Sequence, residues 1–369
     1  MRSVLAFVKK EPVLAVSFLA AFVSCCFVAP DRTYLSYIDF KTLALLFCLM
    51  TVVEGLNRAG IFRSMASFTL KKCGTLRSVG VALVLMSFVS SMLITNDVAL
   101  ITFVPFAILV LTMANAPQAI VWVVVVQTIA ANMGSMLTPV GNPQNLYLFS
   151  KYGLGFGEFF GITAPVWIVS LVVCLVLCFG VRKTKLELPQ IEKTVVDGRS
   201  ALVYAVLFVV CLLVVFRILP WPVMLAAVVL TALVVDRGIL RSADYCLLLT
   251  FVMFFVFSGN LSRMGSVRNA LGSLLKGREL LVSALSSQVI SNVPAALLLS
   301  AFTDNARGLI LGTDIGGLGT PIASMASLIG YKLYCASKGA EPGKFMKTFL
   351  VLNFSLLILA LAGASMFLA

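Results

Sequence analysis

Two short polar segments interrupt otherwise apolar stretches, and each contains residue types that can bind an ion. Residues 95–97 read Thr-Asn-Asp within the stretch 78–112, and residues 291–294 read Ser-Asn-Val-Pro within the stretch 279–302. Asn amides, Ser and Thr hydroxyls and freed backbone carbonyls can replace the water around a small cation, whereas exposed helix N-termini attract an anion. We therefore predict that both segments are tips of helical hairpins that contribute to an ion-binding site.

The composition indicates that these segments belong to a membrane protein. Of the 369 residues, 60% are hydrophobic and 12% are charged, and the mean hydropathy is +1.06. Soluble globular chains are roughly 45–50% apolar and 25% charged, so the composition excludes an ordinary soluble enzyme, a disordered protein and a nucleic-acid-binding protein. The nine cysteines form no CxxC motif and lie mostly in apolar runs, which is typical of space-filling residues rather than metal ligands.

Two longer polar breaks interrupt the apolar stretches 118–150 and 309–337. Residues 138–145 read Thr-Pro-Val-Gly-Asn-Pro-Gln-Asn, and residues 313–317 read Thr-Asp-Ile-Gly-Gly. Pro removes a backbone donor and Gly weakens a helix, so we expect both stretches to be broken helices with freed backbone groups. In lipid, such irregular backbone persists only where protein buries it or where it lines a wet cavity.

Two carboxylates, Asp97 and Asp314, lie in these breaks. A charge at the centre of a bilayer costs about 2.5–3.5 kcal/mol on insertion scales, so we expect each acid to coordinate a cation, to bind a proton, or both. The alternative is that each carboxylate caps the N-terminus of a half-helix. Because the chain has no histidine, these carboxylates are the obvious carriers of any transported proton.

The cationic residues predict an orientation in the membrane. The apolar runs are long enough to span, since a spanning helix needs roughly 20 apolar residues, and we expect the first run to be retained rather than cleaved. Cytoplasmic loops are enriched in Lys and Arg. With the N-terminus in the cytoplasm and the C-terminus outside, about two thirds of the 28 Lys and Arg residues fall on the cytoplasmic side.

Three segments of the first half recur in the same order in the second half. They are residues 56–60 with 261–265, residues 90–96 with 286–292, and residues 132–139 with 314–321. In the predicted orientation the two copies are inverted, a plan common among secondary transporters. We expect a first repeat at 1–181, a cytoplasmic linker at 182–199 and a second repeat at 200–369. The cationic run at 259–278 is then the mirror copy of a cytoplasmic segment.

The breaks resemble those of the ion transporter superfamily, which includes arsenite permeases, sodium/proton antiporters, silicon-efflux carriers and citrate or dicarboxylate carriers. The string at 138–145 and the tip at 95–97 are most similar to the arsenite permease-like and anion-permease branch. In the dicarboxylate branch both tips read Ser-Asn-Thr. This chain departs from that pattern at Asp97 and Val293, and its second broken helix lacks the Gly-Asn-Pro-Gln-Asn string.

The resemblance implies an all-α polytopic fold with two re-entrant hairpins and two broken helices, a scaffold that often forms a homodimer, and a transport domain with an elevator-like motion. By the same resemblance, the half-site of the first repeat would comprise Thr95, Asn96, Asp97, Asn132, Gly134, Thr138, Pro139, Gly141, Asn142, Pro143 and Asn145. The half-site of the second repeat would comprise Ser291, Asn292, Thr313, Asp314, Gly316 and Thr320. A bound Na⁺ would lie at Asn96, Asp97, Asn292 and Asp314.

These observations favour a secondary active transporter of a small anion or oxyanion, such as a carboxylate or an arsenite- or silicate-like species, coupled to Na⁺ or H⁺ in the plasma or inner membrane. One alternative is a Na⁺/H⁺ antiporter. Another is a passive channel or an arsenical permease that works with a separate ATPase. An enzyme is the least favoured interpretation, since the chain has no His and no HExxH or GxSxG element. We expect no cofactor other than a bound or transported cation, and no nucleic-acid partner.

Overall fold

The computed structural model describes residues 11–185 and 195–368, and within these ranges the chain is helical and contains no β-strand. Eight of the described helices are long and apolar enough to cross a membrane. The prediction of an all-α polytopic membrane protein is therefore confirmed. Residues 1–10, which include the predicted cytoplasmic cations Arg2, Lys9 and Lys10, lie outside the described residues, as do residues 186–194 of the predicted linker.

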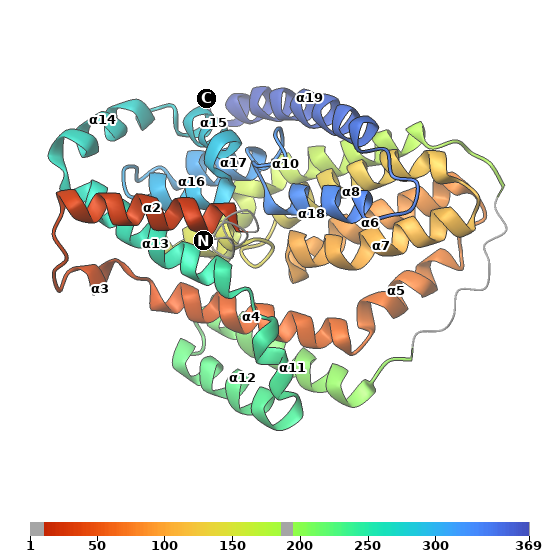
Figure 1. The fold of residues 1–369 in the computed structure, drawn as a ribbon, viewed down its shortest axis with the longest axis horizontal. Coiled ribbons are helices and arrows are strands. Elements are labelled where there is room, and N and C mark those ends of the chain that lie inside the picture. Colours follow the sequence, from red (N-terminus) through yellow and green to blue (C-terminus); the bar gives the residue numbers. More distant parts are fainter. Residues whose placement is uncertain (1–10, 186–194, 369) are drawn as a thin grey trace, which may run out of the picture.

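One group of helices interleaves the two halves of the chain, and we call it the interleaved group. It comprises α2 (Pro12–Phe27), α3 (Tyr34–Tyr37), α4 (Phe40–Arg58), α11 (Gly198–Val215), α12 (Trp221–Val235), η3 (Arg237–Ser242) and α13 (Tyr245–Arg263). In Figure 1, α11 and α12 lie at the bottom of the view and pack against α4, whereas α2 packs against α13. Each half of the chain therefore covers a helix of the other half.

Ion pairs at the ends of α4 and α13 also join the two halves of the chain. Arg58 at the end of α4 pairs with Asp236 at 2.9 Å, and Arg263 at the end of α13 pairs with Asp31 at 2.9 Å. Arg58 and Arg263 occupy matching positions in the first pair of repeated segments. Each arginine therefore binds an acid contributed by the opposite half of the chain.

The remaining helices form a second group, which we call the hairpin group. It comprises α5 (Ile61–Leu70), α6 (Leu76–Ile94), α7 (Asn96–Met113), η1 (Pro117–Ala119), α8 (Ile120–Ser135), α9 (Pro143–Lys151), α10 (Phe156–Leu177), η2 (Cys178–Gly180), α14 (Gly265–Leu275), α15 (Glu279–Ile290), α16 (Asn292–Leu299), α17 (Ala306–Ile315), α18 (Met325–Cys335) and α19 (Pro342–Leu368). α8 packs against α6, α7, α10 and α18. It is apolar on nearly every face and almost wholly buried, as expected of a helix enclosed by others.

The polar breaks in the sequence coincide with helix ends. α6 and α7 are separated by residue 95 alone, and α15 and α16 by residue 291 alone. Irregular segments at 136–142 and 316–324 separate α8 from α9 and α17 from α18. α6 and α7 have 19 and 18 residues, whereas α15 and α16 have 12 and 8. Re-entry of these pairs into a membrane, and the inversion of the two halves, stay predictions.

Candidate functional site

The two hairpin tips have the same backbone conformation. Thr95 has φ 67° and ψ 151°, and Ser291 has φ 74° and ψ 154°. Such angles are rare for residues with a side chain and persist only where the surrounding structure holds them. The two tips therefore share a specific turn that starts α7 and α16.

Each tip is bonded to the broken helix of its own half through matching positions. The bonds run from Asn96 N–H to the Gly141 carbonyl (3.2 Å), from the Thr138 hydroxyl to the Met92 carbonyl, from Asn292 N–H to the Ala323 carbonyl (2.9 Å), and from the Thr320 hydroxyl to the Gln288 carbonyl (3.0 Å). The last two bonds lie at the positions that the sequence repeat pairs with the first two. The repeat in the sequence is thus a repeat in hydrogen bonding.

Gly134 and Gly316, which the repeat also pairs, let the hairpins approach the broken helices closely. A Cβ atom at Gly134 would lie 2.1 Å from the Phe88 carbonyl oxygen, and one at Gly316 would lie 2.8 Å from Ser287 Oγ. Real Cβ atoms do not come this near. Both glycines therefore serve packing.

Asp314 is held by amides from the first half. The side chain of Asp314 is buried, and its carboxylate accepts hydrogen bonds from Asn145 Nδ2 at 3.0 Å, Gln144 Nε2 at 3.4 Å and Asn142 Nδ2 at 3.5 Å. All three donors belong to the Gly-Asn-Pro-Gln-Asn string of the first broken helix. Among the described residues no Lys or Arg forms an ion pair with Asp314, so side-chain amides are its polar partners.

Asn132 makes the reciprocal contacts with the second half. Its Nδ2 donates to Ser327 Oγ at 3.2 Å and to the Gly317 carbonyl at 3.5 Å, while its Oδ1 accepts from Ser324 Oγ at 2.9 Å and from Asn96 Nδ2 at 3.1 Å. The sequence repeat pairs Asn132 with Asp314, Ser324 with Asn142, and Ser327 with Asn145. Each broken helix is therefore bonded to the other through equivalent positions.

A cavity of about 380 Å³ lies beside this network, and it is lined by both hairpin tips. Four helices begin at its wall: α7 at Asn96, α9 at Pro143, α16 at Asn292 and α18 at Met325. Several N–H groups of these first turns already have partners, such as Asn96 N–H on the Gly141 carbonyl and Asn292 N–H on the Ala323 carbonyl, but each helix N-terminus still carries roughly half a positive charge. Four convergent N-termini make this cavity suited to an anion.

Charged side chains also line this cavity. Asp97 lies on the first tip, Asp244 precedes α13, Glu11 precedes α2, and Lys332 comes from α18. The cavity can therefore hold a cation near the carboxylates as well as an anion near the helix N-termini and Lys332. A site that neutralises an anion with a co-bound cation needs both kinds of group.

The structure places only some of the predicted site residues at this cavity. Asn96, Asp97, Pro143, Ser291 and Asn292 line it, whereas Asn132, Asn142, Asn145 and Asp314 form the buried network beside it. The other predicted residues do not line it: Thr95, Gly134, Thr138, Pro139, Gly141, Thr313, Gly316 and Thr320. Several of these hold the shape of the breaks, as the bonds of Thr138 and Thr320 show.

The sequence analysis missed several residues of the site. Gln144 lies inside the string at 138–145 and could have been chosen with its neighbours, and Ser324 would have followed from extending the repeat beyond Pro321. No sequence signal singled out Asp244 or Lys332. In the sequence they resemble an ordinary helix cap and a loop cation, and only the packing of α13 and α18 brings them to the cavity.

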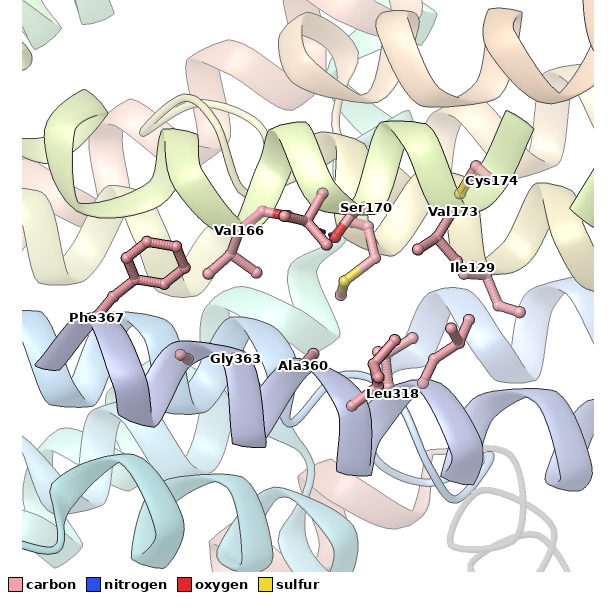
Figure 2. Close-up of a pocket in the computed structure, with 14 residues that line it drawn as sticks. Ile129, Val166, Ser170, Val173, Cys174, Leu318, Ala360, Gly363 and Phe367 are labelled. Atoms are coloured by element: carbon pink, nitrogen blue, oxygen red, sulfur yellow. Dashed lines mark hydrogen bonds between the residues drawn. The ribbon is translucent and has the colours of Figure 1, made fainter. Parts of the chain in front are cut away.

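Two further cavities differ from this one in chemistry. Figure 2 shows a crevice of about 50 Å³ between α8, α10 and α19, with a lining that is almost entirely apolar, including Ile129, Val166 and Leu318. A polar cavity of about 560 Å³ is lined by Lys151, Arg268 and Lys276 among others. Because α9 begins at the 380 Å³ cavity and ends at Lys151, the 380 Å³ and 560 Å³ cavities lie at opposite ends of α9.

Interrupted apolar helices that are bonded to one another around an ion-attracting cavity define a membrane transporter. Comparison with known proteins agrees with this class. The model of the citrate transporter family matches residues 4–330, and the chain belongs to this family. The family assignment confirms the resemblance to the ion transporter superfamily.

Three relatives illustrate the similarity. The chain is 32% identical over 334 residues to an uncharacterized transporter of Methanocaldococcus jannaschii, covering 89% of this chain and 90% of the relative. It is 28% identical over 308 residues to the inner membrane protein YbiR of Escherichia coli, covering 82% of each chain. A putative transporter arsB of Dictyostelium discoideum is 32% identical over 140 residues, which cover 38% of this chain and 24% of the relative.

Proposed function

We propose that this protein is a secondary active transporter of a small anion or oxyanion, coupled to Na⁺ or H⁺. The observation that carries the proposal is the convergence of four helix N-termini on one cavity, lined by both charged and apolar residues, between two equivalent hairpin tips. A helix N-terminus stabilises a nearby anion by about 0.3–1 kcal/mol when exposed, and by up to about 2 kcal/mol when partly buried. Four such ends acting together can bind an anion without an arginine clamp.

The carboxylates at the same cavity support coupling to a cation. Among the described residues, Asp97, Asp244 and Glu11 outnumber Lys332 there, so an anion that entered alone would meet net negative charge from these side chains. A bound Na⁺ or H⁺ removes part of this repulsion. Binding of the cation therefore favours binding of the anion, and by linkage the reverse also holds.

The position of the cavity supports an elevator-like motion. Its wall includes residues 11–14 and Asp244 of the interleaved group, and both tips of the hairpin group. Movement of the hairpin group against the interleaved group would carry the tips, the broken helices and the bound ions together. In the predicted orientation, Lys332 and the residues that precede α2 and α13 lie toward the cytoplasmic side. We therefore propose that this state is open toward the cytoplasm of a plasma or inner membrane. We also propose that the interleaved group forms a homodimer.

Solute flux into proteoliposomes tests the proposal. Radiolabelled citrate, succinate, phosphate, sulfate, silicate and arsenite are offered under an imposed Na⁺ gradient, an imposed pH gradient, or neither. Arsenite is included because one relative is named a putative arsB transporter. We expect saturable uptake of one class of anion that depends on one gradient. Absence of solute flux under every gradient would contradict the proposal.

A Na⁺/H⁺ antiporter is the second candidate. The observation that favours it is Asp97, which lines the cavity and whose buried Oδ1 has no hydrogen-bond partner among the described residues. A pH-sensitive dye inside proteoliposomes separates the two functions. Pulses of Na⁺ or Li⁺ move protons in the antiporter without any other solute, whereas the anion transporter requires its substrate.

A further inference from the structure

Asp97 carries a polar atom that the rest of the structure does not satisfy. Its Oδ1 is buried and has no hydrogen-bond partner among the described residues, although the side chain lines the 380 Å³ cavity. A buried polar atom left without a partner costs about 1–3 kcal/mol. The position therefore suits an external ligand that a carboxylate oxygen can bind, namely a cation.

A second carboxylate faces the same space from the interleaved group. Asp244 caps α13, where one of its oxygens accepts a hydrogen bond from Leu247 N–H at 2.8 Å. Asp244 also lines the cavity that Asp97 lines. Two nearby carboxylates repel each other unless a cation or a proton lies between them.

Other ionisable groups at the cavity do not neutralise this pair. Glu11 adds a further negative charge, Cys246 lies two residues beyond Asp244, and Lys332 approaches from α18. Among the described residues, Lys332 forms no ion pair with either aspartate. Within the described ranges, no cationic side chain thus forms an ion pair with either carboxylate.

The other half of the molecule provides a natural comparison. Asp39 caps α4 as Asp244 caps α13, accepting a hydrogen bond from Thr42 N–H at 3.0 Å. The second tip, however, has Val293 where the first has Asp97, and Asp39 does not line the cavity. The first tip and the cap of α13 in the opposite half therefore both carry an acid, whereas the equivalent pairing of the second tip with the cap of α4 has only one.

We propose that Asp97 and Asp244 together hold the coupling cation, Na⁺ or H⁺, between the first hairpin tip and the start of α13. This inference rests on the proposed function and adds to it a residue of the interleaved group. Because Asp97 belongs to the hairpin group, relative motion of the two groups separates the two ligands. Both carboxylates hold the cation in the state seen here, and the cation stays with Asp97 when the groups move apart. The loss of Asp244 as a ligand then weakens its binding, which ties its release to the transport motion.

Cation-dependent thermal stability of the purified protein in detergent tests this assignment without any anion. In the sodium arm, the unfolding temperature is followed at pH 8 as NaCl replaces choline chloride at constant ionic strength. In the proton arm, it is followed from pH 8 to pH 5 in choline chloride. We expect the wild type to be stabilised in one arm, and that arm identifies the cation.

The decisive variant is Asp244→Asn, with Asp39→Asn as its matched control. Asn caps a helix about as well as Asp, so both variants keep the helix start and lose one charge. We expect Asp244→Asn and Asp97→Asn to raise the half-saturating Na⁺ concentration, or the half-saturating proton concentration, by at least about ten-fold. Asp39→Asn should respond as the wild type does.

Two results would overturn the assignment. One is a wild-type protein that is stabilised in neither arm, and the other is an Asp244→Asn variant whose half-saturating concentration equals that of Asp39→Asn. Neither result depends on solute flux, so failure of this assignment and failure of the proposed anion transport can be told apart. Anion flux that persists with unchanged cation dependence in Asp244→Asn would place the coupling cation elsewhere.

Discussion

Positions 132 and 314 are equivalent in the two halves, yet they carry different chemistry. Asn132 is bonded to the hydroxyls of Ser324 and Ser327, whereas Asp314 is bonded to amides that include Asn142 and Asn145. The two broken helices are bonded to each other through equivalent positions in both directions. One of these contacts, however, centres on the neutral amide of Asn132 and the other on the carboxylate of Asp314. The repeat therefore preserves the framework of the site, while charge is concentrated at particular positions.

The hairpin tips show the same principle. Their turns and backbone bonds agree, but the residue after the shared Asn is Asp97 in one tip and Val293 in the other. Within the tips and broken helices, each half thus contributes one acid from a different element, Asp97 from a tip in the first half and Asp314 from a broken helix in the second. Two equivalent half-sites can in this way serve two different ions.

The largest effect on stability is expected from a substitution that gives positions 132 and 314 the same charge. In Asn132→Asp, a second buried carboxylate replaces an amide that now donates to Ser327 and to the Gly317 carbonyl. The lost donor and the buried charge should lower the free energy of unfolding by about 2–3 kcal/mol. Thermal and denaturant unfolding in detergent measure this loss.

Asp314→Asn is the matched variant for that experiment. It keeps an oxygen that can accept from Asn145, and the neighbouring amides can reorient, so we expect a change within about 1 kcal/mol. If Asn132→Asp is no less stable than Asp314→Asn, the surroundings of positions 132 and 314 do not discriminate between an amide and a carboxylate.

An intermediate effect is expected from relaxing the tips. Thr95 and Ser291 both have positive φ, a conformation that costs about 1–3 kcal/mol for a residue with a side chain and that glycine adopts readily. Thr95→Gly should stabilise the protein by about 1 kcal/mol. Ser291→Gly should gain less, because it loses a hydrogen bond of 3.4 Å to the Ala323 carbonyl.

Thr95→Ala and Ser291→Ala serve as controls, since alanine removes the hydroxyl without relieving the backbone. Melting temperatures of the four variants in one detergent make the comparison. Stabilisation of one tip and destabilisation of the other by glycine would show that the two turns are not energetically equivalent.

The smallest effect concerns the ion pairs of the interleaved group. Hydrogen bonds from Thr33, together with the Arg263 guanidinium, lower the pKa of Asp31 below its ordinary value. A lowered pKa in the folded state stabilises the fold above the ordinary Asp pKa, and this contribution is lost as the pH falls through the folded-state value. Unfolding temperatures measured across that acid range should fall slightly more for the wild type than for Asp31→Asn. If the unfolding temperatures of the two proteins depend on pH in the same way, ionised Asp31 does not stabilise the fold.

Much of the fold could be predicted from the sequence because lipid imposes simple rules. Long apolar runs must be helices, and Pro, Gly and Asn clusters inside them must be breaks. The order of the repeated segments paired position 132 with 314 before any contact was known.

The cavity itself could not be predicted in the same way. Asp244 and Lys332 reach it through the packing of helices that are distant in the sequence, and no local pattern records such packing. Conversely, Thr138 and Thr320 have the composition expected of ligands, but their hydroxyls bond to backbone carbonyls of the hairpins. Residue type and spacing identified the breaks, whereas the direction of each side chain depended on tertiary structure.

Binding of the transported anion to two variants that each add one negative charge tests most directly whether both halves build one site. Asn96→Asp and Asn292→Asp place a carboxylate at equivalent positions of the two tips, each on the wall of the 380 Å³ cavity. Affinity is measured by calorimetry with the anion that the flux screen identifies, after unfolding measurements show that both variants fold. If the two tips share one anion, both variants should lose at least about 100-fold in affinity. Wild-type affinity in either variant would show that its tip takes no part in binding the anion and would contradict a site shared by the two halves.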